Sequence, residues 1–213
     1  MTTQLQLYND ALLIVGERAL ASLTENREPR RLLDQVWSGG GVKFCLEQGQ
    51  WFFAMCSGML DYDTTIVPTF GYNYAFKKPD DWLLTSAVCS DEFFREPLTR
   101  YSDEAGFWYT DLQTIYVKYV SILPNYGMNI GAWPEAFNKY VAAYFASRIC
   151  NKITQDENKT KLIEADCDRL LKDAKSASAM TQPTKFPAPG NWTRSRMRNG
   201  MNRDGGNTSG NLY

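Results

Sequence analysis

The sequence of 213 residues contains no histidine. Histidine is the most common general base and a frequent metal ligand, because its charge changes near neutral pH. Its absence excludes serine–histidine and cysteine–histidine catalytic mechanisms, and it excludes histidine-based metal sites. Catalysis by this chain would depend on carboxylates, lysine, cysteine or tyrosine, and we expect that the protein is not an enzyme.

The cysteines include no close pair and no Cys-x-x-Cys motif. Zinc sites and secreted disulfide frameworks both need short or regular cysteine spacings. We therefore predict reduced cysteines in the core, and we expect neither a metal nor another cofactor. The five cysteines are Cys45, Cys56, Cys89, Cys150 and Cys167.

Long apolar runs are also missing. The run at residues 11–15 is far shorter than the ~20 residues of a transmembrane helix. No segment has the pattern of a secretory signal. We expect a protein that is made in the cytoplasm and is kept there or assembled from there.

The charge is nearly balanced over the whole chain but uneven along it. Formal charge is −1 in total, and residues 181–213 carry five basic side chains against one acidic one, which leaves −5 on residues 1–180. A chain that binds nucleic acid through its whole surface shows a global basic excess, which is absent here. The basic part of the sequence is its tail.

Residues 1–50 have the pattern of a helical region. Thr3 and Gln6 fit a capping box, and the apolar repeat after them predicts a helix through Ala19 that is covered on more than one side. A second helix is expected from Pro29. The run Gly39-Gly-Gly41 lacks the preceding strand and the following Lys-Ser/Thr of a phosphate-binding loop, so it indicates a helix break or a close helix contact.

Residues 123–180 predict a long helical hairpin. Its first helix, after Pro134, is expected to be amphipathic, and Thr154 with Glu157 fits a capping box for the second. One stripe of the second helix is expected to be buried. Its members are Leu162, Ile163, Cys167, Leu170, Leu171, Ala174 and Ala177.

Residues 51–122 change to short aromatic and β-branched runs separated by turn residues. Strands are predicted at residues 51–60, 65–67, 72–76, 83–88, 106–110 and 114–120. The alternation in these runs is typical of half-buried antiparallel strands. The fold class is therefore α+β, a helical bundle with a small inserted antiparallel β module and an extended C-terminal arm at residues 181–213.

Acidic side chains offer one candidate for chemistry. Asp61 and Asp63 would share one face of a strand, as a carboxylate pair or a metal site requires. Acidic doublets also occur at residues 80–81, 91–92 and 103–104. No surrounding motif supplies the remaining ligands, so solvated turns at the edge of the β module are the preferred interpretation.

The arm is the other candidate site, because it interleaves cations with bulky side chains. Its glycine-rich and polar composition does not favour independent folding. Three interpretations stay open: docking on a protein surface, contact with nucleic acid, and no binding role. The candidate docking residues are Phe186, Trp192, Arg194, Arg196, Met197, Arg198 and Met201.

Several blocks of the sequence match one known family in their order. They are Tyr8-Asn-Asp-Ala-Leu-Leu-Ile-Val-Gly-Glu17, Cys45-Leu-Glu, Gly49-Gln-Trp-Phe-Phe-Ala54, Tyr74-Ala-Phe-Lys-Lys-Pro-Asp-Asp-Trp-Leu83, Ile115-Tyr-Val-Lys-Tyr119 and Trp133-Pro-Glu-Ala-Phe137. Over residues 4–180 the chain resembles the tail tubular protein A family of phage head-to-tail connectors. The glycines at 39–41 and the basic tail depart from that pattern.

The resemblance implies a virion structural protein. It implies a homo-oligomeric adaptor ring of twelve copies, bound beneath the portal protein and presenting a platform to a downstream tail protein, with the genome passing through its lumen. The expected location is the connector between capsid and tail, after synthesis in the host cytoplasm. The alternative is a nucleic-acid-binding accessory protein that uses its basic tail.

Overall fold

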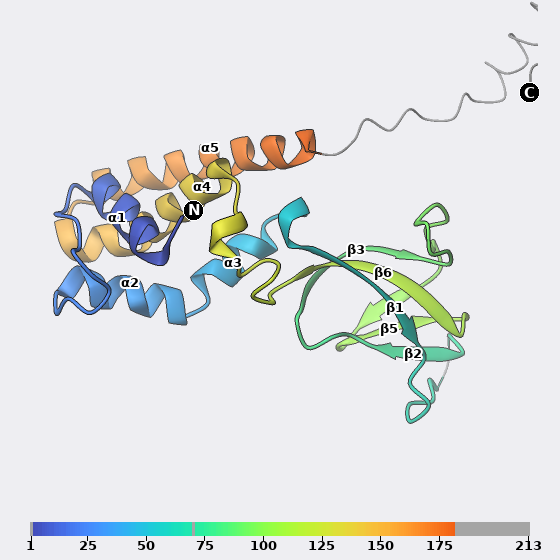
Figure 1. The fold of residues 1–213 in the computed structure, drawn as a ribbon. Helices are drawn as coiled ribbons and strands as arrows, with labels where there is room; N and C mark the ends of the chain where they lie inside the picture. Colours follow the sequence, from blue (N-terminus) through green and yellow to red (C-terminus); the bar gives the residue numbers. More distant parts are fainter. Residues whose placement is uncertain (1, 70, 182–213) are drawn as a thin grey trace, which may run out of the picture. The chain divides into compact units, whose positions relative to one another are not determined.

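A computed structural model describes residues 2–69 and 71–181. Along the sequence, helices precede and follow a strand-rich segment, as the α+β prediction requires (Figure 1). The helices of the described part are α1 (Gln4–Val15), α2 (Glu28–Ser38), α3 (Gly41–Glu47), α4 (Glu135–Thr154) and α5 (Glu157–Met180), with short 3₁₀ turns at η1 (Phe52–Ala54) and η2 (Ile130–Ala132).

Helix α4 is the centre of the helical layer. It packs against α1, α2, α3 and α5, so its buried residues lie on most of its circumference and not on one stripe. The prediction of an amphipathic helix was therefore too narrow, because a helix surrounded by four others has little surface left for water. Near the N-terminus of α4, aromatic side chains pack against one another in the core. They belong to Trp51, Phe53, Trp133, Phe137 and Tyr140.

The strands form two small antiparallel sheets. The first has the order β1 (Met55–Asp61), β6 (Thr114–Ser121), β3 (Trp82–Cys89), and the second has the order β2 (Tyr74–Lys77), β5 (Phe107–Thr110), β4 (Ser102–Glu104). Five of the six predicted strands are confirmed in position. The prediction at residues 65–67 was wrong, since turn and irregular backbone occupy that segment, and β4 was not predicted because it is short and polar.

Strand β6 connects the β module to the helical layer. Ile115, Val117 and Tyr119 lie on one side of the strand in the core of the β module. Val120 faces the other way and belongs to the core that contains the helices, as the alternation of side chains along a strand requires. The two cores therefore share one central strand.

The N-terminal capping box is confirmed, but α1 is shorter than predicted. Thr3 Oγ1 accepts from Gln6 N at 3.3 Å, and Thr3 N donates to Gln6 Oε1 at 3.0 Å. The helix ends at Val15 because Gly16 adopts a left-handed conformation with φ 82°, a common helix terminator. Covering on more than one side was wrong as well, because Leu13 and Ile14 are exposed.

The predicted capping box of the last helix was also wrong. Thr154 is the final residue of α4, and its hydroxyl donates to the Cys150 carbonyl oxygen at 2.9 Å. Asp156 is the N-cap of α5, with its carboxylate accepting from Asn158 N at 2.9 Å. An aspartate cap two residues later satisfies free N–H groups of the first turn, those of Asn158 and Lys159.

Four of the five cysteines are buried and Cys56 is half-buried, and none forms a disulfide. Burial raises the pKa of the Cys167 thiol to about 11. The thiol form is therefore the stable one at neutral pH, and thiolate chemistry is disfavoured. The prediction of reduced core cysteines is confirmed for Cys45, Cys89, Cys150 and Cys167.

Replacing Ile163 by alanine is expected to lower the free energy of unfolding by about 2–5 kcal/mol, because the side chain is buried against the helical core. Leu162 was predicted to share its stripe but is 71% exposed, whereas Ile163 is 6% exposed. Leu162→Ala is thus a matched control, with an expected change below about 0.5 kcal/mol. Denaturant unfolding of both variants checks this, and equal losses at the two positions would contradict the assigned face.

Candidate functional site

The candidate docking residues of the arm lie outside the described residues. These are Phe186, Trp192, Arg194, Arg196, Met197, Arg198 and Met201. They stay a prediction from the sequence.

Asp61 and Asp63 do not form a carboxylate pair on one strand face. Asp61 ends β1 and accepts from Thr114 Oγ1 at 2.8 Å, whereas Asp63 lies in the following turn and accepts from Thr65 N at 2.9 Å. Hydrogen bonds from Thr65 lower the pKa of Asp63. Within residues 2–69 and 71–181, no three cysteine, aspartate or glutamate side chains gather as a metal ion requires.

The acidic doublets include two residues that stabilise the β module. Asp81 accepts from Ser121 Oγ and from Tyr119 Oη at 3.3 Å. Asp103 pairs with the buried Lys78 ammonium, which lies 3.5 Å from the ring centroid of Trp82. These carboxylates have structural partners, so the interpretation as simple solvated turns was incomplete for them.

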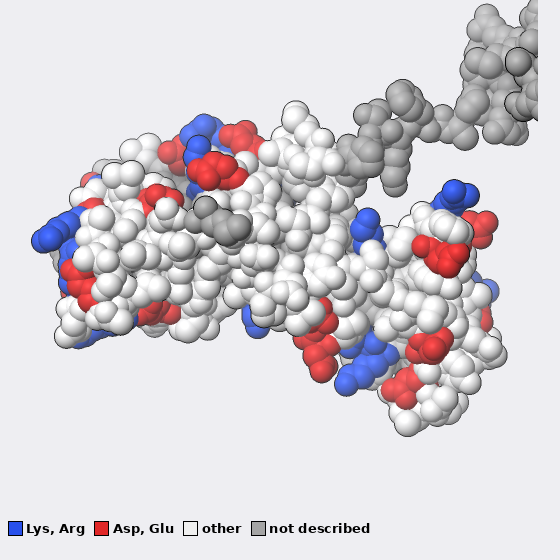
Figure 2. Space-filling model, in the orientation of Figure 1, with Lys and Arg blue, Asp and Glu red and all other residues white. Residues whose placement is uncertain are grey.

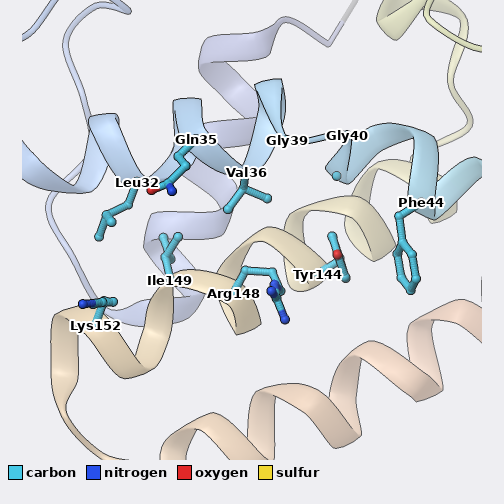
Figure 3. A pocket seen from close by; sticks show the side chains of 11 residues that line it. Leu32, Gln35, Val36, Gly39, Gly40, Phe44, Tyr144, Arg148, Ile149 and Lys152 are labelled. Carbon is cyan, nitrogen blue, oxygen red and sulfur yellow. The ribbon is translucent and has the colours of Figure 1, made fainter.

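A groove with a volume of about 520 Å³ lies between α2, α3 and α4. Figure 3 shows Leu32 of α2 and Ile149 of α4 pointing toward each other across it. We call it the α2–α4 groove. Its lining consists of Leu32, Gln35, Val36, Gly39, Gly40, Gly41, Phe44, Tyr144, Arg148, Ile149 and Lys152.

The glycine run shapes one wall of this groove. Gly40 has φ 88° and separates α2 from α3. A Cβ atom on Gly41 would lie 2.8 Å from the Val36 carbonyl oxygen and 3.3 Å from Cε2 of Phe145. Both parts of the prediction are therefore confirmed: these glycines break the helix, and they permit a close helix contact.

The groove combines apolar walls with positive charge. Arg148 and Lys152 are its only ionisable cations, and within the described part of the chain neither forms an ion pair. At one end Phe44, which is 44% exposed, stacks on Tyr144 with ring centroids 4.9 Å apart. Burial raises the pKa of Tyr144, so its hydroxyl stays neutral. This composition suits an acidic, apolar partner.

A second surface lies where α1, α4 and α5 meet. Leu13 is 77% exposed there, next to Ile14 and Asp10. Burial and the nearby charge of Glu135 both raise the pKa of Asp10. We call Asp10, Leu13 and Ile14 the α1 patch. It borders a hollow of about 250 Å³ that Glu135, Lys139, Ala142 and Leu170 complete.

The β module carries further exposed apolar side chains. Val67 is 84% exposed beside a hollow of about 400 Å³, and Phe93 is 67% exposed. Both lie in loops and not in strands. Single exposed apolar side chains are normal on monomers, so these two residues mark no site by themselves.

No residue of the groove or of the α1 patch was predicted as a site. The available signal was the run of residues 11–15, which is too apolar for the short helix that holds it. The groove had no comparable signal, because its walls come from segments about 100 residues apart in the sequence.

Comparison with protein-family models finds none that matches the chain, and comparison with curated proteins finds no match. Among the described helices, none combines the length and apolar character that crossing a membrane requires.

Proposed function

We propose that this protein is a virion structural protein, the subunit of an adaptor ring that joins a phage portal to its tail. The observation that carries the proposal is the pair of unlike surfaces on the helical layer, the basic α2–α4 groove and the acidic α1 patch. A subunit in a ring meets its neighbours through two different surfaces. The resemblance of residues 4–180 to the tail tubular protein A family supplies the portal as the partner.

The charge of the body suits a channel through which DNA passes. Residues 1–180 carry a formal −5, and Figure 2 shows acidic and basic side chains intermingled on the face that it presents. A surface without a broad basic field does not hold the phosphate backbone. We propose that the ring has twelve copies and that the β module, with Val67 and Phe93, faces the downstream tail protein.

Co-sedimentation with the portal ring encoded by the same genome tests this function. We expect the chain to move with the portal at a ratio of one ring of subunits for each portal. A chain that stays at the top of the gradient at every concentration would contradict the proposal.

Removing residues 181–213 tests the role of the arm. We expect the melting temperature of the body to change little, because its two cores lie within the described residues. Incorporation into the connector is expected to weaken, since the arm offers aromatic and arginine anchors. Equal incorporation of the shortened and full chains at one concentration would show that the arm has no docking role.

The alternative function is a nucleic-acid-binding accessory protein, and the arginines at 194, 196 and 198 favour it. Phosphate contacts are strongest at low salt and weaken steeply as salt rises. DNA binding at low salt that disappears on removing residues 181–213 would support this alternative. Failure to bind DNA even at low salt would exclude it.

A further inference from the structure

We propose that the α1 patch of one copy occupies the α2–α4 groove of the next copy, so that one repeated contact closes the ring. The inference rests on the proposed function and names the surfaces that mediate assembly. The occupant of the groove is thus a second copy of this chain, and it presents Asp10, Leu13 and Ile14 to the neighbour's Arg148 and Lys152.

The two surfaces lie on different sides of α4. Glu135, Lys139 and Ala142 border the α1 patch, whereas Tyr144, Arg148 and Lys152 line the groove. At 100° and 1.5 Å per residue, these two sets are separated by roughly 150° around the helix and about 14 Å along it. One subunit can therefore use both surfaces at once, and its contact does not pair a surface with itself. Such a head-to-tail contact produces a closed ring when the rotation closes.

Both surfaces present aliphatic side chains that would be buried against each other in the contact. Leu13 and Ile14 are adjacent on α1 and both are exposed, Leu13 by 77%. The groove offers the half-buried Leu32 and Val36 as apolar walls above the buried Ile149, in a volume of about 520 Å³. A volume of this size falls within the ~300–1,000 Å³ of sites that enclose small ligands. It is ample for two aliphatic side chains, and the contact would remove both from water.

The charges of the two surfaces are opposite, although Lys139 also lies close enough to Asp10 to lower its pKa. Asp10, Arg148 and Lys152 form no ion pair within the described part of the chain, whereas Lys139 lies 3.9 Å from Glu135. Burial already raises the pKa of Asp10, so a neighbouring cation would stabilise its charged form. Opposite charges across an interface fix register and exclude wrong partners.

The arm is a weaker candidate for the groove. Residues 181–213 carry a formal +4, and the groove contributes two further cations with no acidic side chain in its lining. Repulsion between like charges disfavours that pairing. The same charges make the α1 patch, with its acidic side chain, the better match.

Charge reversal in the full-length chain tests the contact. Asp10→Arg and Arg148→Glu should each raise the concentration needed for ring assembly on the portal by about tenfold or more. Combining both changes in one chain should restore assembly, because the opposite charges meet again in exchanged positions. Asp173→Arg, at an exposed site of α5, is the matched control and should assemble normally. Circular dichroism melting confirms that each variant is folded.

A mixing experiment gives an independent readout. The Asp10→Arg chain keeps a working groove, and the Arg148→Glu chain keeps a working α1 patch. An equimolar mixture should assemble, because the unchanged Asp10 and Arg148 meet at one contact and the two substituted side chains, again of opposite charge, meet at the next, whereas neither variant should assemble alone. Analytical ultracentrifugation separates these species.

The outcomes distinguish the inference from the function on which it rests. If the unmodified chain assembles on the portal and both single variants assemble equally well, this contact is refuted and the adaptor function stands. If the unmodified chain never assembles, the adaptor function fails. Loss of hydrogen-exchange protection in the groove on removing residues 181–213 would make the arm its occupant, and that would also overturn the inference.

Discussion

Replacing Phe137 by alanine is expected to lower the free energy of unfolding by about 3–5 kcal/mol. The ring of Phe137 is 1% exposed, and its centroid lies 4.7 Å from that of Trp51 and 4.9 Å from that of Phe53. Trp133 meets it edge-on at 5.1 Å. Two of these neighbours are fixed by hydrogen bonds, since Trp51 Nε1 donates to the Leu46 carbonyl oxygen and Trp133 Nε1 to that of Gly127. The two tryptophan side chains therefore cannot readily move into the space that opens when alanine replaces phenylalanine.

Urea unfolding at neutral pH measures this loss. Phe93 is the matched control, because the same side chain is 67% exposed there, and Phe93→Ala should change the free energy by less than about 0.5 kcal/mol. A loss below about 1 kcal/mol at Phe137 would show that the aromatic cluster is not the tightly packed centre of the helical core.

Replacing Asp103 by asparagine is expected to cost about 2–4 kcal/mol, although the change is nearly isosteric. The Lys78 side chain is 6% exposed and pairs with this carboxylate. Asparagine can still accept the hydrogen bond from Trp108 Nε1, which donates to Asp103 at 3.1 Å. Lys78 and Trp108 donate to different oxygens of Asp103, and asparagine has only one oxygen, so the loss combines the missing counter-charge of a buried ammonium with one missing acceptor. Because the Asp103 side chain is 38% exposed, water reduces that cost below the value for a fully enclosed pair.

A second substitution tests this explanation. Lys78→Met in the Asp103→Asn background removes the unpaired ammonium and keeps an aliphatic chain beside Trp82, whose ring centroid lies 3.5 Å from Lys78 Nζ. The double variant should recover at least half of the lost stability, because an apolar replacement of an ion pair is often tolerated. Equal instability of the single and double variants would show that Asp103 acts through its hydrogen bonds and not through charge.

Local signals predicted much of the fold. The pair Thr3 and Gln6 located the start of α1, and Pro29 located the start of α2 within one residue. Alternation in residues 114–120 located β6 with nearly correct limits. These features depend on neighbours in the sequence, through capping and side-chain alternation, so they can be recognised without the tertiary structure.

The predictions that were wrong failed for two reasons. Some ignored a residue that ends a helix, and others concerned burial, which depends on tertiary contacts. Gly16 ends α1, and the apolar residues before it were then assigned to a core that does not reach Leu13. Leu162 shared the period of the buried stripe on α5 yet lies on its outer flank. Periodicity fixes which residues share a face, whereas the width of the buried sector depends on how the neighbouring helices pack.

The candidate site could be predicted still less. The α2–α4 groove needs the glycine break after α2 and the placement of Arg148 and Lys152 on α4, and neither its depth nor its charge follows from any one segment. The arm was recognised from composition alone, and its seven candidate residues lie outside the described part. Sequence blocks indicated a connector subunit, and the helical layer adds two surfaces through which such a subunit could assemble.

Native mass spectrometry of the chain mixed with the portal tests the proposed adaptor ring most directly. We expect the portal ring to gain a fixed mass close to twelve times the 24.3 kDa of the chain, without a ladder of intermediate stoichiometries, since a ring that closes through one repeated contact is favoured over partial arcs. A portal ring whose mass does not change at saturating concentrations of the chain would contradict the adaptor function.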